Sequence, residues 1–234
     1  MKLKQTMFTS LLAVPALLVV SSAQAAPITG QANIAGVVDV TATSVNFAPT
    51  FVTTTGASET GDFTGLTGGT IKSLTGGPVT GNFFVPQFAT FNGGVGQTIY
   101  FDLTYIAPGV GNVADCSSSA PGAECTPVIA GQKSPFTLFQ LTSNTVIASL
   151  QLNGTSYTGT AATGSSPTTS IFSTQTAISG TIPQVLAMLA TTGLQGITYS
   201  ASFVATPIPE PASMLLVGIG LIGAGLIARR RIAK

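Results

Sequence analysis

Two cysteines, Cys116 and Cys125, are the first candidates for chemistry in this chain, and they enclose an eight-residue loop, SSSAPGAE. The chain has no His, which excludes Cys–His catalysis and leaves too few good ligands for zinc. No imidazole or nearby cation is present to favour a reactive thiolate. In an oxidising compartment we therefore expect a disulfide, and closing a loop of about ten residues would stabilise the fold by roughly 2–3 kcal/mol.

The acidic residues are the second candidates. Between the basic ends of the chain there are six of them: Asp39, Glu59, Asp62, Asp102, Asp115 and Glu124. Glu59 and Asp62 lie in the loop-like stretch TGASETGDFTG, where carboxylates and carbonyls together could bind calcium weakly, but two solvated loop acids are the simpler interpretation. Asp115 and Glu124 would approach each other if the disulfide forms, yet a small exposed loop does not supply the cleft that paired-carboxylate glycosidases need. We expect no catalytic, cofactor-binding or metal-binding residue, and hence no enzyme.

Composition restricts the function classes further. Only 6% of the 234 residues are charged, against about a quarter in ordinary soluble proteins. The part between the basic ends has two lysines, Lys72 and Lys133, and no arginine, which argues against nucleic-acid binding. Trp is absent and Tyr occurs four times, so an aromatic sugar-binding platform has weak support. Tyr199 is expected in the core, Tyr100 at the surface and Asp102 in solvent.

The beginning of the chain has the pattern of a secretory signal peptide. Lys2 and Lys4 precede an apolar stretch at residues 11–20, and Ala23-Gln24-Ala25 is a small-residue cleavage site. The apolar stretch is too short to span a bilayer, and cleavage after Ala25 avoids placing Pro27 immediately past the cut. We therefore predict a signal peptide at residues 1–25 and export of the remainder.

The end of the chain has three consecutive parts. Residues 206–213 are proline-rich and contain Pro209-Glu210-Pro211, residues 214–228 are uncharged and apolar, and residues 229–234 include Arg229, Arg230 and Arg231. Three prolines in five residues keep the backbone extended. The apolar run reaches roughly 22 Å as a helix, which spans a bilayer only marginally, and the arginines mark its cytoplasmic side.

This tripartite end resembles the PEP-CTERM sorting signal. The match runs from about residue 207 to residue 234, with Ile208 where Val is common. The resemblance implies recognition by exosortase, a membrane-embedded enzyme with a Cys nucleophile found in Gram-negative bacteria that make exopolysaccharide. It implies an inner-membrane-anchored precursor whose tail is lost or transferred, and a mature form at the cell surface or in the extracellular matrix. It implies nothing about the domain that precedes it.

That domain, residues 26–205, is dominated by period-2 alternation. The alternation is clearest at residues 99–106, 146–152 and 197–205, and weaker at 33–40, 43–47, 82–90, 136–142 and 170–178. Asn153-Gly154 is a strong two-residue hairpin signal, with residues 155–160 as the returning strand. Residues 181–192 lack alternation, begin near Pro183 and end before Gly193, which predicts one short helix capping the sheets.

We therefore expect an all-β fold, an antiparallel, jelly-roll-like β-sandwich with one short helix. A β-solenoid is the alternative, because residues 64–70 and 74–77 look loosely repetitive, although no fixed period continues. The expected function is that of an exported structural or adhesive protein of the surface or exopolysaccharide matrix. A carbohydrate-binding module of the same matrix, with exopolysaccharide as its ligand, is the second hypothesis.

Overall fold

The computed structural model describes residues 27–53, 59–75, 80–94, 96–129, 131–159, 164–207 and 218–222. The elements in chain order are β1 (Gly30–Val40), β2 (Val45–Phe47), β3 (Thr50–Thr53), β4 (Thr60–Gly61), β5 (Gly68–Ile71), β6 (Gly81–Gly94), β7 (Gln97–Ile106), the 3₁₀-helix η1 (Val113–Ser117), β8 (Glu124–Cys125), β9 (Val128–Ile129), β10 (Gln132–Lys133), β11 (Phe136–Thr142), β12 (Thr145–Thr158), β13 (Ser166–Thr174), β14 (Ile178–Ser179), α1 (Ile182–Thr191) and β15 (Leu194–Ala205). Most segments predicted as strands from their alternation are strands.

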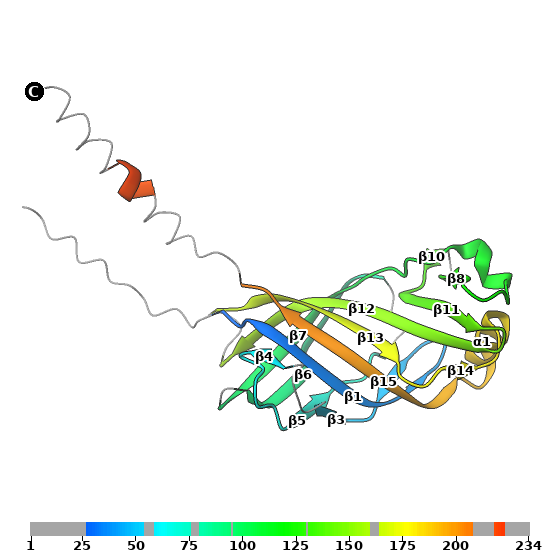
Figure 1. The fold of residues 1–234 in the computed structure, drawn as a ribbon, viewed down its shortest axis with the longest axis horizontal. Helices are drawn as coiled ribbons and strands as arrows, with labels where there is room; N and C mark the ends of the chain where they lie inside the picture. Colours follow the sequence, from blue (N-terminus) through cyan, green and yellow to red (C-terminus); the bar gives the residue numbers. More distant parts are fainter. Residues whose placement is uncertain are drawn as a thin grey trace, which may run out of the picture.

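The main sheet closes on itself. Its order is β13-β15-β1-β3-β5-β6-β7-β12, and β12 also pairs with β13, so eight antiparallel strands form a closed barrel (Figure 1). The strands β11 and β8 extend the sheet from β12 beyond the ring. Figure 1 shows α1, β8, β10 and β14 gathered at one end of the barrel. We call this end the α1 end.

The prediction of an all-β antiparallel fold is confirmed, but the predicted β-sandwich is wrong, and so is the solenoid alternative. The sheet closes because of β12, whose 14 residues are enough to pair with two different strands along one edge. Its first half pairs with β11 and its second half with β7, while the opposite edge pairs with β13. Because one strand continues through both regions, the sheet closes instead of dividing into two packed sheets.

The hairpin predicted at Asn153-Gly154 is also wrong, because β12 runs straight through both residues. The register against β7 shifts between them, as in a β-bulge. A side chain at Gly154 would collide with the main-chain oxygen of Asp102 and the ring of Phe101. This glycine therefore permits close approach of two strands and does not form a turn.

Phenylalanine side chains fill much of the barrel interior. Phe91 and Phe101 both pack edge-to-face on Phe203, with ring centroids 5.0 and 5.3 Å apart, and Phe63 packs edge-to-face on Phe91. These rings are fully buried. Edge-to-face contacts between rings add to the stabilisation that burial provides, so the alternating strands meet in one aromatic core.

The helix predicted at residues 181–192 is confirmed as α1. Its first turn is capped by Gln184, whose Oε1 accepts the backbone N–H of Thr181 at 2.9 Å. The helix ends where Gly193 adopts a φ of 72° and donates its N–H to the carbonyl of Met188 at 2.8 Å. Ile182 and Val185 are buried in a second hydrophobic cluster with Cys125. As expected, α1 covers one end of the sheet.

Candidate functional site

The last barrel strand ends immediately before the sorting-signal-like tail. β15 ends at Ala205, and Thr206 remains attached to the barrel because its N–H and its hydroxyl both donate to the carbonyl of Pro167, at 3.0 and 3.4 Å. Pro207 is exposed. The barrel therefore ends at residue 206, and the tail begins at residue 207.

The first and last barrel strands are neighbours. Gly30, at the start of β1, lies opposite Ala205, at the end of β15. Both ends of the domain therefore lie at the same end of the barrel, away from α1 (Figure 1). A protein held through residue 207 would present its α1 end away from the attachment point.

Most of the tail lies outside the described residues. This applies to Pro209, Glu210 and Pro211 and to Arg229, Arg230 and Arg231, as it does to the predicted signal peptide at residues 1–25. Of the predicted membrane helix at 214–228, residues 218–222 are described and are helical. Among the residues that the structure describes, no helix is both long and apolar enough to cross a bilayer.

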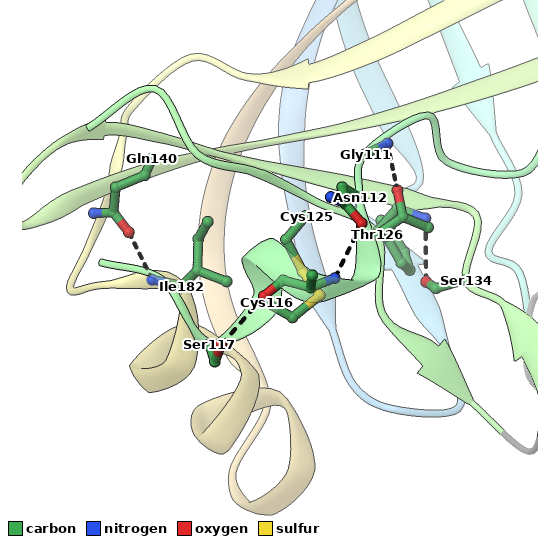
Figure 2. The surroundings of a disulfide bond; sticks show 11 residues. Gly111, Asn112, Cys116, Ser117, Cys125, Thr126, Ser134, Gln140 and Ile182 are labelled. Atoms are coloured by element: carbon green, nitrogen blue, oxygen red, sulfur yellow. Dashed lines mark hydrogen bonds between the residues drawn. A yellow bond between two sulfur atoms is a disulfide. The ribbon is translucent and has the colours of Figure 1, made fainter. Parts of the chain in front are cut away.

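The predicted disulfide is present and joins Cys116, in η1, to Cys125, in β8 (Figure 2). Side chains around it order the loop: Oδ1 of Asn112 accepts the N–H of Ala114 at 3.1 Å, and Oγ1 of Thr126 accepts the N–H of Gly111 at 2.8 Å. Cys125 is fully buried. The disulfide therefore fastens η1 to the sheet at the α1 end.

The acids Glu59 and Asp62 bind backbone groups of their own region. Oδ2 of Asp62 accepts the N–H of Thr29 at 2.7 Å, and Oε2 of Glu59 accepts the N–H groups of Gly65 and Leu66 at 3.2 and 3.3 Å. Asp115 and Glu124 lie on the two elements that the disulfide joins. Within the described ranges, no three Cys, Asp or Glu side chains gather where they could hold a metal ion.

Asp102 does not face solvent as predicted, since only 7% of it is exposed. Its side chain points outward from β7, but the irregular part of β6 covers it: the N–H of Gln87 donates to Oδ1 at 2.6 Å, and the hydroxyl of Tyr157 donates to the same oxygen at 3.0 Å. Tyr199 is buried as expected, and Tyr100 is half-buried, with its ring centroid 5.6 Å from that of Tyr157.

Comparison with known proteins supports the predicted sorting signal in the tail and gives no information about the barrel. The family model of the PEP-CTERM protein-sorting motif matches residues 207–231. No curated protein and no solved structure matches the chain. The matched region begins one residue after the last barrel hydrogen bond at Thr206. The chain therefore carries a PEP-CTERM protein-sorting motif at residues 207–231, and this motif implies export in a Gram-negative bacterium and processing by exosortase.

Proposed function

We propose that this chain is a non-enzymatic structural or adhesive protein of the cell surface or the exopolysaccharide matrix. The signal peptide at residues 1–25 directs export, and the helix at 214–228 holds the precursor in the inner membrane. Arg229, Arg230 and Arg231 stay on the cytoplasmic side. Exosortase then acts at Pro209-Glu210-Pro211, and the tail is lost or exchanged as the barrel is delivered.

The observation that carries this proposal is the junction between the barrel and the motif. The match to the sorting motif begins at residue 207, two residues after the last residue of β15. Since Thr206 still bonds to Pro167, a cut or exchange at Pro209-Glu210-Pro211 removes no residue of the barrel. The folded domain can therefore survive sorting intact.

A non-enzymatic role is supported by how the carboxylates are used. Four of the six acids before the tail accept backbone N–H groups: Asp39 from Gly196, Glu59 from Gly65 and Leu66, Asp62 from Thr29, and Asp102 from Gln87. Hydrogen bonds from backbone N–H groups to a carboxylate are charge-assisted and therefore hold the main chain firmly. These acids serve the fold.

A structural role is supported by the closed sheet. Each of the eight barrel strands is hydrogen-bonded to neighbours on both sides around the ring. Because unpaired strand edges promote aggregation, closure suits a protein that remains outside the cell for long periods. The disulfide at the α1 end adds a covalent link that an oxidising environment preserves.

Sorting is tested in a host that has exosortase. Glu210→Ala, or deletion of Arg229–Arg231, should leave unprocessed full-length protein in the inner-membrane fraction, measured by immunoblot of separated membrane, surface and medium fractions. Glu124→Ala removes an exposed carboxylate from the barrel and serves as the matched control, which should be processed normally. Unchanged size and location of the Glu210 variant would contradict the sorting proposal.

A carbohydrate-binding module is the second candidate, and one observation favours it. Phe84 on β6 and Tyr105 on β7 are 68% and 36% exposed, and Tyr105 pairs with Asn82, two residues before Phe84. Exposed aromatic rings on neighbouring strands offer apolar faces on which sugar rings can pack. On a glycan array, the mature protein should lose binding with Phe84→Ala and Tyr105→Ala but keep it with Ile171→Ala, an exposed residue of β13. Absence of any retained glycan would reject this candidate.

A further inference from the structure

Two adjacent apolar cavities lie at the α1 end of the barrel. The inner cavity has a volume of about 60 Å³ and the outer one about 280 Å³. Phe136, Leu138 and Leu189 line both of them, so these three side chains form the wall between the two spaces. A ligand that displaced part of this wall would occupy one continuous channel.

The inner cavity lies beside the aromatic core of the barrel, at the α1 end. Its walls include Val38, Phe47, Phe172 and Tyr199 from the barrel strands and β2, with Leu189 from α1. The hydroxyl of Tyr199 is buried and makes no hydrogen bond within the described structure. Since close-packed cores leave few voids larger than a water molecule, the space beneath α1 is a distinct feature of this barrel.

The outer cavity lies between α1, the turn after β1 and the segment that carries β9. Leu186, Leu189 and Ala190 of α1 form one side, and Thr41 and Pro127 lie among the residues of the other. No charged side chain lines either cavity in the part of the chain that the structure describes. The occupant must therefore be uncharged and apolar where it is enclosed.

The two cavity volumes indicate which shape of ligand would fit. An apolar cavity of about 150 Å³ is the size known to hold a benzene ring, so the inner cavity, at about 60 Å³, is too small for one. The end of an unbranched chain is thinner than a ring and would fit. The larger outer cavity has room for the methylenes that follow.

The helix α1 is anchored to the sheet mainly through its N-terminal half. It is flanked by Gly180 and Gly193, whose φ values of 122° and 72° are the left-handed conformations that glycine adopts most readily. Only Ile182 and Val185 of this helix are fully buried, while Leu186 and Leu189 are half-buried. A small outward shift of the C-terminal half of α1 would open the wall at Leu189 without removing the buried anchor.

We propose that the α1 end of the barrel binds the unbranched aliphatic chain of a lipid-like molecule, with the chain end in the inner cavity and the following methylenes in the outer one. The site lies opposite the attachment end, where Gly30 and Ala205 meet. A surface protein attached in this way would carry a lipid-binding end directed away from its own anchor.

The test is photolabelling of the full chain in isolated cell envelopes with a linear decanol that carries a diazirine near its methyl end and an alkyne for detection. We expect labelled peptides that contain residues 134–138, 148–150 or 186–190, and competition by unlabelled decanol. Labelling confined to residues outside both cavities, or insensitive to decanol, would overturn the proposal. A diazirine on a bulky adamantane cage should not label the inner-cavity residues.

Variants distinguish labelling in the two cavities from nonspecific labelling of apolar surfaces. Ala148→Leu adds bulk to a residue that lines the inner cavity and should reduce labelling there by about tenfold, a change of about 1.4 kcal/mol in binding. Ala187→Leu makes the same change at an exposed position of α1 and should label normally. If Ala148→Leu fails to fold, Leu189→Ala provides the second test, because it widens the passage and should admit the adamantane probe. Equal labelling of all variants by both probes would reject the site.

Discussion

The hydroxyl of Tyr157 on β12 lies 3.0 Å from Oδ1 of Asp102 on β7 and donates a hydrogen bond to it. The same oxygen accepts the N–H of Gln87 on β6 at 2.6 Å. Gln87 has a φ of 48° and is the one non-glycine residue with a positive φ in the described part of the chain. A single carboxylate oxygen therefore joins three consecutive barrel strands and holds a backbone conformation that side chains rarely adopt.

We expect Asp102→Ala to lower the free energy of unfolding by about 1–3 kcal/mol, because it leaves the buried hydroxyl of Tyr157 and the N–H of Gln87 without their acceptor. Urea unfolding followed by circular dichroism measures this loss. Glu124→Ala, which removes an exposed carboxylate, should change stability by less than about 0.5 kcal/mol. Equal stabilities of the two variants would show that the Asp102 contacts do not support the barrel.

Alkaline pH should destabilise the barrel through two tyrosines. Burial raises the pKa of Tyr199, and burial together with the hydrogen bond to Asp102 raises the pKa of Tyr157, both from an ordinary value of 10.0. Above pH 10 the unfolded chain loses these protons while the folded chain keeps them, so their stabilising contribution is complete below pH 10 and falls as pH rises further. Urea midpoints between pH 8 and pH 11.5 should decline at the alkaline end. The decline should be shallower in Tyr157→Phe and in Tyr199→Phe, and an unchanged slope would contradict this assignment.

Local patterns predicted local structure well. The helix at α1 follows from Pro183 near its start and Gly193 after its end, and both residues act where the pattern places them. The disulfide between Cys116 and Cys125 follows from the predicted export into an oxidising compartment and from the short loop that separates the two residues. Tyr199 in the core follows from alternation along β15. Each of these depends on residues that are close together in the chain.

Features that depend on distant segments could not be predicted. Whether the sheet closes depends on both edges of β12 finding partners, and period-2 alternation is the same in a sandwich and in a barrel. Asp102 points outward from β7, as its place in the alternation predicts. It is nevertheless covered by the irregular part of β6, and alternation along β7 carries no information about that neighbouring strand. The turn preference of Asn153-Gly154 is overridden because Gly154 lies against β7. The cavities beneath α1 form from segments that span most of the domain.

Gly36 should not tolerate a side chain. It lies opposite Tyr199 in the β1–β15 register, and a Cβ at this position would come within 2.8 Å of the tyrosine hydroxyl and ring. Gly36→Ala should therefore lower stability by about 1–3 kcal/mol, because the ring must leave its place in the core. In a Tyr199→Leu background the same change should cost less, and the difference measured by a double-mutant cycle reports the contact directly. If the effects of the two substitutions on stability are additive, the Tyr199 ring is not the group that excludes a side chain at Gly36.

Loss of the disulfide should loosen the α1 end more than the rest of the barrel. Cys116→Ser with Cys125→Ser should lower the free energy of unfolding by about 2–3 kcal/mol in the chain-entropy model. Cys125 is fully buried in the cluster that includes Ile182 and Val185 of α1, so amide hydrogen exchange should increase in η1 and α1 before it increases in β1 or β15. Titration of two free thiols on the exported wild-type protein would contradict the disulfide itself.

Gln140 on β11 should control how firmly α1 is docked. Its side chain is fully buried; Nε2 donates to the carbonyl of Thr142 at 2.7 Å, and Oε1 accepts the N–H of Ile182 at 2.8 Å. Gln140→Ala leaves both backbone groups without these partners and should lower stability by about 1–3 kcal/mol. Gln184→Ala removes only the bond from the exposed side of the same helix end and should cost about 1 kcal/mol or less. Hydrogen exchange of the α1 amides, which should accelerate in Gln140→Ala well beyond Gln184→Ala, distinguishes the two contacts. Equal acceleration would assign the docking of α1 to its apolar contacts with the sheet instead of to this buried amide.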